Sequence, residues 1–251
     1  MGKIFFFLGA PLRNVRVFPD PDAMAEALAL RLKEEADRAV NEKRVCSVVL
    51  SGGETVAKVY RKLSAPGLGE QIPWQVVHLF WADERCVFPE SKESNFGIAH
   101  RTFLKSISIP DENIHRIRGE AEPLSESVRY GQEIKNHMAL RRGKKFFFDW
   151  VLLGVGVDGH TASLFPMHET SLRSQNLCEE VQHPQTGQKR ITLTPFALKR
   201  SANITYHVIG EEKSLIVPEL VSNIRTSRYP VTQIPGEFYL DQSAASKLNI
   251  S

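Results

Sequence analysis

The sequence predicts an α/β fold with a mostly parallel, Rossmann-like open sheet that helices cover on both faces. Three apolar runs, at 45–50, 75–81 and 149–154, have the length and composition of buried strands. Each run ends in a short loop that carries glycine or charged residues, and helical patterns follow the loops. Strands that alternate with helices favour parallel pairing, because each crossover returns the chain to the same edge of the sheet.

Length and composition suit one globular domain over residues 1–251, with room for a small second lobe. Of its 251 residues 42% are hydrophobic, which is enough for a sizeable core. The net charge is +3, and the sequence lacks the clustered basic residues of a nucleic-acid binder. This charge is compatible with a small anionic ligand. The three scattered cysteines, Cys46, Cys86 and Cys178, form no disulfide framework, which favours the cytoplasm.

The apolar stretch at 3–10 is short and is followed by charged residues without a small-residue cleavage site. We therefore expect no cleaved signal peptide. No segment reaches the ~18 apolar residues of a membrane-spanning helix, so we expect no membrane partner. The basic residues at 141–145 are expected to form a solvated turn. The chain is expected to be a monomer or a small homo-oligomer.

Capping signals and periodicity place the other elements. Asp20 and Pro21 supply an N-cap and a proline at the first helical position, and apolar residues then recur every four positions as far as residue 40. Further strands are expected at 15–18, 114–117, 189–194 and 203–210, and further helices at 56–63, 96–104, 124–138, 195–200 and after 211. Residues 161–165 are expected to begin a helix, 167–188 to be irregular, and the tail from 230 to hold a last strand and a C-terminal helix.

Chemically active residues follow three of the strands, at 51–55, 83–85 and 158–160. In an open parallel sheet such strand ends converge on one edge, where ligands bind. The first loop, Ser-Gly-Gly-Glu-Thr, precedes a helix and offers backbone N–H groups, hydroxyls and partial positive charge to an anion. Glu54 must then point away from that anion.

His160 has the titration range of a general base near neutral pH, and neighbouring carboxylates would orient its ring. Arg85 would stabilise developing negative charge. Gly154, Gly156 and Gly159 match a dinucleotide fingerprint, but Asp158 stands where a pyrophosphate needs uncharged backbone, so no nicotinamide cofactor is expected.

No set of histidines, cysteines and carboxylates has the spacing of metal ligands, so no metal site is expected. The seven histidines other than His160, among them His78 and His183, have no comparable acidic and glycine-rich surroundings in the sequence. They are expected to be structural or solvated.

Residues 153–166, Leu-Gly-Val-Gly-Val-Asp-Gly-His-Thr-Ala-Ser-Leu-Phe-Pro, resemble the signature of the 6-phosphogluconolactonases. Further blocks match that family in the same order, at 51–55, 83–89, 94–95, 190–194 and 210–213. The related glucosamine-6-phosphate deaminases share Asp-Gly-His but continue Ile-Ala-Phe-Asn-Glu-Pro, so residues 161–166 favour the lactonase. Glu54, Val56 and Tyr239 depart from the Ser, Pro and Trp that are common in the family.

The resemblance implies hydrolysis of 6-phospho-D-glucono-1,5-lactone to 6-phospho-D-gluconate in the oxidative pentose phosphate pathway, without metal or organic cofactor. It implies that His160 is the general base, that Asp158 or Glu84 orients it, and that Arg85 faces the oxyanion. Substrate contacts are expected from Ser51, Gly52, Gly53, Thr55, Asp83, Gly156, Gly159, Arg190 and Lys213. Two alternatives stay open: a deaminase or isomerase of amino-sugar phosphates, and a non-enzymatic sugar-phosphate sensor on the same fold.

Overall fold

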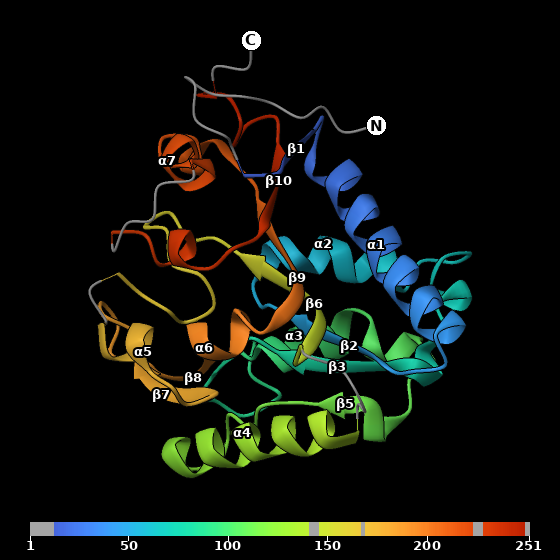
Figure 1. Cartoon of the computed structure of the whole chain (residues 1–251). Coiled ribbons are helices and arrows are strands. Elements are labelled where there is room, and N and C mark those ends of the chain that lie inside the picture. Colours follow the sequence, from blue (N-terminus) through green and yellow to red (C-terminus); the bar gives the residue numbers. More distant parts are fainter. Residues whose placement is uncertain (1–12, 141–145, 167–168, 223–227, 249–251) are drawn as a thin grey trace.

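A computed structural model describes residues 13–140, 146–166, 169–222 and 228–248 (Figure 1). The expectations for the apolar stretch at 3–10 and for the basic turn at 141–145 fall on residues outside these ranges. Among the described helices, none combines the length and the apolar composition that crossing a membrane requires.

A seven-stranded sheet, in which all neighbouring strands are parallel, forms the centre of the fold and confirms the predicted class. Its order is β1 (Val15–Phe18), β10 (Glu237–Asp241), β9 (Ser201–Val208), β6 (Phe148–Gly154), β2 (Cys46–Leu50), β3 (Val77–Trp81) and β5 (Ile114–His115). The middle strand, β6, is buried at every residue except Gly154. Its nearly continuous apolar sequence is therefore that of a strand covered on both faces.

A second, three-stranded antiparallel sheet has the order β4 (Asp83–Arg85), β8 (Lys189–Leu193) and β7 (Cys178–Gln182). The expectation that 167–188 is irregular was wrong, because this range contains β7 and the short helix α5 (Glu169–Arg173). Only Cys178 and Val181 of β7 are buried, so the strand has almost no apolar alternation to reveal it. The strand β4 is likewise too short and too polar to have a sequence signal.

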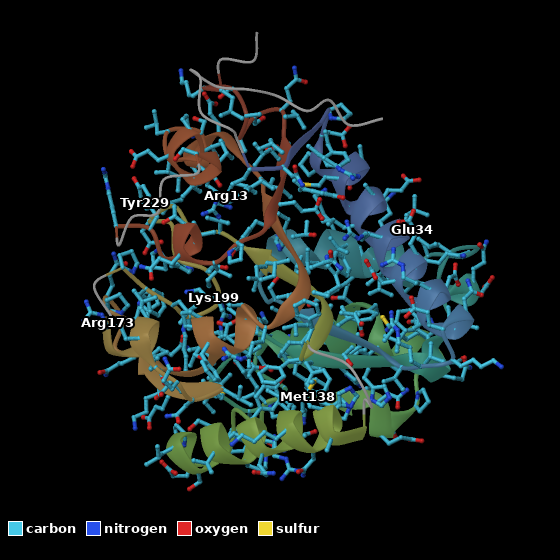
Figure 2. The ribbon with its side chains drawn as sticks, viewed as in Figure 1. Arg13, Glu34, Met138, Arg173, Lys199 and Tyr229 are labelled. Carbon is cyan, nitrogen blue, oxygen red and sulfur yellow. The ribbon has the colours of Figure 1, made fainter. Side chains whose placement is uncertain are left out.

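Helices flank the large sheet on both sides: Figure 1 shows α1 (Pro21–Asn41) and α2 (Glu54–Leu63) on one side and α4 (Pro123–Leu140) on the other. The first begins as predicted, since the Asp20 carboxylate accepts the backbone N–H groups of Asp22 and Ala23, both at 2.8 Å. The remaining helices are α3 (Asn95–Thr102), α6 (Pro195–Leu198) and α7 (Val217–Val221). Side chains fill the space between helices and sheet as one core (Figure 2).

Two expected helices are absent from the described ranges. Residues 161–165 form turns, with an isolated bridge between Thr161 and Leu164, so the expected helix start was wrong. Residues 242–247 follow β10 as turns, and the expected C-terminal helix is not found among the described residues there. Short 3-10 segments occur at Gly69–Gln71, Trp74–Val76, Leu104–Ser106, Asp111–Asn113, Glu211–Lys213 and Pro230–Gln233.

The strand order reverses between β6 and β2. From β2 the chain adds β3 and β5 toward one edge, whereas from β6 it adds β9 and β10 toward the other. Connections that diverge in this way leave a crevice at the carboxyl ends of the two central strands, where open α/β sheets bind ligands. The topology therefore points to the loops that follow β2, β3, β6 and β9.

Candidate functional site

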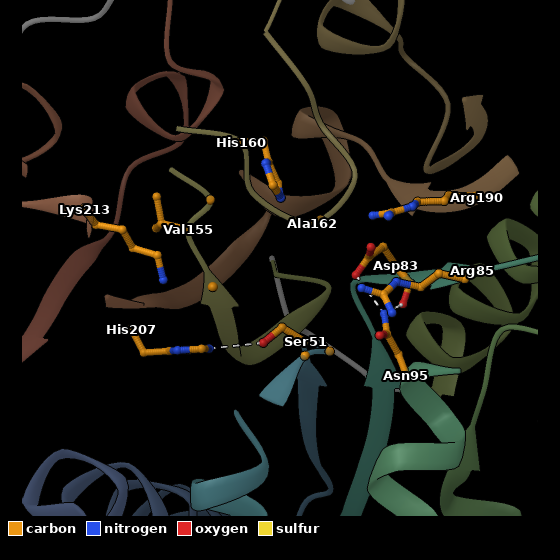
Figure 3. Close-up of a pocket in the computed structure, with 14 residues that line it drawn as sticks. Ser51, Asp83, Arg85, Asn95, Val155, His160, Ala162, Arg190, His207 and Lys213 are labelled. Carbon is orange, nitrogen blue, oxygen red and sulfur yellow. Dashed lines mark hydrogen bonds between the residues drawn. The ribbon is translucent and has the colours of Figure 1, made fainter. Parts of the chain in front are cut away.

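A pocket of about 190 Å³ lies at this crevice. Ser51 follows β2, Val155 follows β6, His207 lies near the end of β9, and Asp83 begins β4 just after β3 (Figure 3). The complete lining is Ser51, Gly52, Gly53, Asp83, Arg85, Asn95, Gly154, Val155, Gly156, His160, Ala162, Arg190, His207 and Lys213. Residues far apart in sequence are thus assembled around one cavity.

Most of the residues singled out from the sequence line this pocket: Ser51, Gly52, Gly53, Asp83, Arg85, Gly156, His160, Arg190 and Lys213. Three others, Glu84, Asp158 and Gly159, are not among the lining residues. Thr55 belongs to the first turn of α2, but its side chain and that of Glu54 are outside the described part of the structure.

His160 and Asp158 form a hydrogen-bonded pair beside the pocket. The Nδ1 atom of His160 lies 2.6 Å from Oδ1 of Asp158, and the same oxygen accepts the His160 backbone N–H at 3.1 Å. Burial acts to raise the pKa of Asp158, but the hydrogen bond and positive charge of His160 outweigh it and lower that pKa. When the ring is neutral and its Nδ1–H donates to the ionised carboxylate, Nε2 has a lone pair.

Two glycines make room for this arrangement. A Cβ on Gly156 would lie 2.2 Å from Nδ1 of His160, so any side chain there would displace the ring. Gly159 has a φ of 75°, and a Cβ on it would lie 2.3 Å from the ring of Tyr229. Gly159 therefore shapes the turn between Asp158 and His160, although it was expected to contact the substrate.

The Glu84 carboxylate is hydrogen-bonded to the start of α3. It is buried and accepts the backbone N–H groups of Asn95 at 2.7 Å and Phe96 at 2.8 Å, at the start of α3. The Ser94 hydroxyl donates to it as well, at 3.0 Å. Of the two acids expected to orient His160, only Asp158 has a hydrogen bond to it in the described structure.

Burial raises the pKa of Glu84 to about 7, although its backbone donors act to lower that pKa. These contacts make Glu84 an anchor for the helix that presents Asn95.

Cations flank the cavity on two sides: Lys213 on one, Arg190 and Arg85 on the other (Figure 3). Burial is the main cause that lowers the pKa of Arg190, and Arg85 nearby adds to this effect while Asp83 opposes it. Burial likewise lowers the pKa of Lys213, against the attraction of Glu212 and Asp241. Partly dehydrated cations of this kind favour an anionic ligand.

Both carboxylate oxygens of Asp83 accept hydrogen bonds from neighbouring side chains. Its Oδ2 accepts the Ser163 hydroxyl at 2.6 Å, and Oδ1 accepts an Asn95 amide hydrogen at 3.2 Å. Gly52 permits this contact, since a Cβ there would lie 1.7 Å from Oδ1 of Asn95. The sequence places Asn95 in a block that matches the family but indicates no role for it. Its position at the first turn of α3 could not be placed beside Asp83 without the fold.

His207 is another lining residue that sequence reasoning missed. Its Nε2 lies 3.2 Å from the Ser51 hydroxyl, and it is buried. Burial, with a smaller effect of Lys213, lowers the pKa of His207 to about 3, so the ring is neutral near pH 7. The sequence does contain an indication of this role. His207 is close to the end of a predicted strand, and ligands bind at the carboxyl ends of strands in open α/β sheets.

Comparisons with known proteins show which family the chain resembles. The family model described as glucosamine-6-phosphate isomerases/6-phosphogluconolactonase matches residues 19–240. A 6-phosphogluconolactonase of Haemophilus influenzae is 40% identical over 207 residues, which cover 80% of this chain and 87% of that protein. One of Treponema pallidum is 35% identical over 204 residues, covering 81% and 83%. The crystal structure of the devB protein superposes with a TM-score of 0.86 at 36% identity, covering 94% of this chain and 99% of the other.

Proposed function

The chain belongs to the glucosamine-6-phosphate isomerase/6-phosphogluconolactonase family, and we propose that it hydrolyses 6-phospho-D-glucono-1,5-lactone to 6-phospho-D-gluconate by general-base catalysis. It is an enzyme of the lactone-hydrolase class. The Haemophilus influenzae and Treponema pallidum relatives, which are 40% and 35% identical to it, belong to the same class. The reaction belongs to the oxidative pentose phosphate pathway. A cytoplasmic location is part of the proposal, because all three cysteines are free thiols.

The observation that carries the mechanism is the pairing of His160 with Asp158 at the pocket. In the proposed reaction Nε2 of His160 takes a proton from water, and the water oxygen attacks the C1 carbonyl of the lactone. The bond between C1 and the ring oxygen then breaks, and His160 returns its proton to that oxygen. Asp158 holds the tautomer and stabilises the transient imidazolium.

Charge placement supports the same substrate. Arg85 faces the oxyanion that develops on the C1 carbonyl. The phosphate binds at the Ser51 loop, where the N-terminus of α2 adds partial positive charge, with Arg190 and Lys213 on either side (Figure 3). Asp83, fixed by Ser163 and Asn95, accepts a hydrogen bond from a sugar hydroxyl.

The rate acceleration that this reaction requires of the protein is modest. A δ-lactone is an activated ester that also hydrolyses unaided, so it needs only a positioned base and a polarised carbonyl. One general base contributes about 10²–10⁴-fold, and positioning of the ring adds to this factor. The residues around the pocket supply both.

The test is a coupled assay in which the lactone is generated in situ and its decay is followed with and without the protein. We expect decay well above the spontaneous rate, and no ammonia from glucosamine 6-phosphate. Release of ammonia would support the deaminase alternative. Thermal stabilisation by 6-phosphogluconate without any acceleration of lactone decay would support the sensor alternative.

A further inference from the structure

Three histidines converge outside the pocket, between β3, β5 and α4. His78 belongs to β3, His115 to β5 and His137 to α4, and each offers one ring nitrogen to a group whose atoms all lie within 4.8 Å of one another. The sequence hides this group, because its members are far apart and lie in three different elements. The expectation that no metal site exists rested on sequence spacing alone.

The first two rings already face each other across a shared hydrogen. Nδ1 of His78 lies 2.9 Å from Nε2 of His115, the ring planes differ by 16° and the centroids are 5.2 Å apart. The two rings are therefore nearly parallel and stacked, and the two nitrogens face each other. In tetrahedral zinc sites with Zn–N bonds of 2.0–2.1 Å, ligand nitrogens lie about 3.3 Å apart. A small opening of this pair would admit a cation in place of the shared hydrogen.

Partners behind the rings already hold them in place. Nδ1 of His115 lies 2.8 Å from Oε1 of Glu133, whose other oxygen accepts a hydrogen bond from Arg129. Nε2 of His137 lies 2.6 Å from the Ser47 hydroxyl on β2. Metal-binding histidines characteristically use their second nitrogen for a carboxylate or another such partner, which fixes the ring and raises its basicity. The group has this outer layer before any metal binds.

Burial of the group is suited to a bound ion. His137 is buried at 6% exposure, while the side chain of His115 is 14% exposed and His78 is half-buried. The site is thus largely dehydrated but open to solvent along one side. It is also remote from the catalytic residues in the fold, because His78 is near the amino end of β3, whereas the pocket lies beyond its carboxyl end.

We propose that His78, His115 and His137 bind a divalent transition-metal ion, with zinc as the representative, and that Glu133 orients His115 from behind. Three imidazoles favour zinc, nickel or copper over magnesium or calcium, which prefer oxygen ligands. The ion would link three elements. Among the described strands, β5 pairs only with β3 and is two residues long, so a metal that ties it to β3 and α4 would stabilise this edge of the sheet.

The test uses the full chain, stripped of metal by a chelator and then dialysed against zinc chloride. We expect about one zinc per chain and a thermal midpoint that rises by about 5–10 °C when zinc exceeds its dissociation constant a hundredfold. Both effects should be lost in His78→Gln and in His115→Gln. His100→Gln, at an exposed position of α3, is the matched control and should retain both.

A second measurement keeps the proposal testable if those variants fold poorly. X-ray absorption of the zinc-loaded wild-type protein should show three imidazole nitrogens around the metal. The proposal is overturned if the protein takes up no zinc, if His115→Gln binds zinc as tightly as the wild type, or if His160→Asn abolishes binding, since the last result would place the metal in the pocket.

Discussion

Nδ1 of His160 and Oδ1 of Asp158 lie 2.6 Å apart, and a single residue separates the two in the chain. The turn that brings them together depends on Gly159, whose φ of 75° is readily available only to glycine. A local hydrogen bond, made by neighbours in one loop, therefore fixes which nitrogen of His160 carries the hydrogen. That relationship sets the first expectation.

Replacing Asp158 with Asn should lower kcat about 10- to 100-fold and leave KM nearly unchanged, because an amide does not stabilise the imidazolium that forms during proton transfer. Steady-state kinetics would measure this effect. In the double variant with His160→Ala, the Asp158→Asn change should cost almost nothing more, since the two residues act as one unit. Fully additive losses would show that Asp158 acts elsewhere.

His160→Ala should lower kcat by about 10²–10⁴-fold, the contribution of one general base. Because the ring is partly exposed and packs on Phe165 from one side, the fold should persist, and 6-phosphogluconate should still raise the thermal midpoint. The measurement pairs turnover with ligand-induced stabilisation. Turnover like that of the wild type in a folded variant would exclude His160 as the base.

Lys213→Gln and Arg190→Gln should each raise KM about 10- to 100-fold with a smaller change in kcat, as expected for loss of a charge-assisted hydrogen bond to phosphate. The matched control is Lys105→Gln, which removes an exposed lysine away from the pocket and should leave both constants unchanged. A drop in kcat at saturation with KM unchanged would assign the altered residue to the chemical step.

Gly156→Ala should lower kcat strongly, because the added methyl group would lie 2.2 Å from Nδ1 of His160 and must displace the ring. Gly131→Ala is the control. It lies in α4, where a Cβ would meet nothing closer than a Leu177 side-chain atom at 3.8 Å, and alanine favours a helix more than glycine does. Equal activity of the two variants would contradict the crowding argument.

Glu84 should make stability depend on pH. Burial raises its pKa to about 7, above the roughly 4.3 of an unfolded chain, so the native state binds this proton more tightly. Its contribution to the free energy of unfolding is therefore full below about pH 4.3 and is lost as the pH rises through about 7. Denaturant titrations at several pH values, compared with Glu84→Gln, would isolate this slope. An opposite slope would mean that the N–H donors of α3 dominate.

The sequence reveals those parts of the fold whose signals are local. The apolar run of β6, the capping by Asp20 and the strand-end positions of Ser51 and His160 all follow from neighbours along the chain. The strand β7 escapes prediction because its partners are distant and its burial is slight.

The same limit applies to the site. Residues 161–165 form turns where a helix was expected. In this segment the Ser163 hydroxyl donates a hydrogen bond to Asp83, which is 80 positions away in the sequence. Asn95, which also meets Asp83, has its position set by the Glu84 carboxylate. Contacts of this kind are visible only after folding.

The place of β10 in the large sheet has a consequence for synthesis of the protein. The strand β10 lies between β1 and β9, so the sheet neighbour of β1 is a strand that is far away in the sequence. During synthesis β1 therefore stays without this sheet partner until β10 has emerged from the ribosome. Until then β9 presents an open edge, on which a second nascent chain could pair. Slow elongation between β9 and β10 would prolong this exposure, and a chaperone that covers the β9 edge would prevent such pairing in that interval.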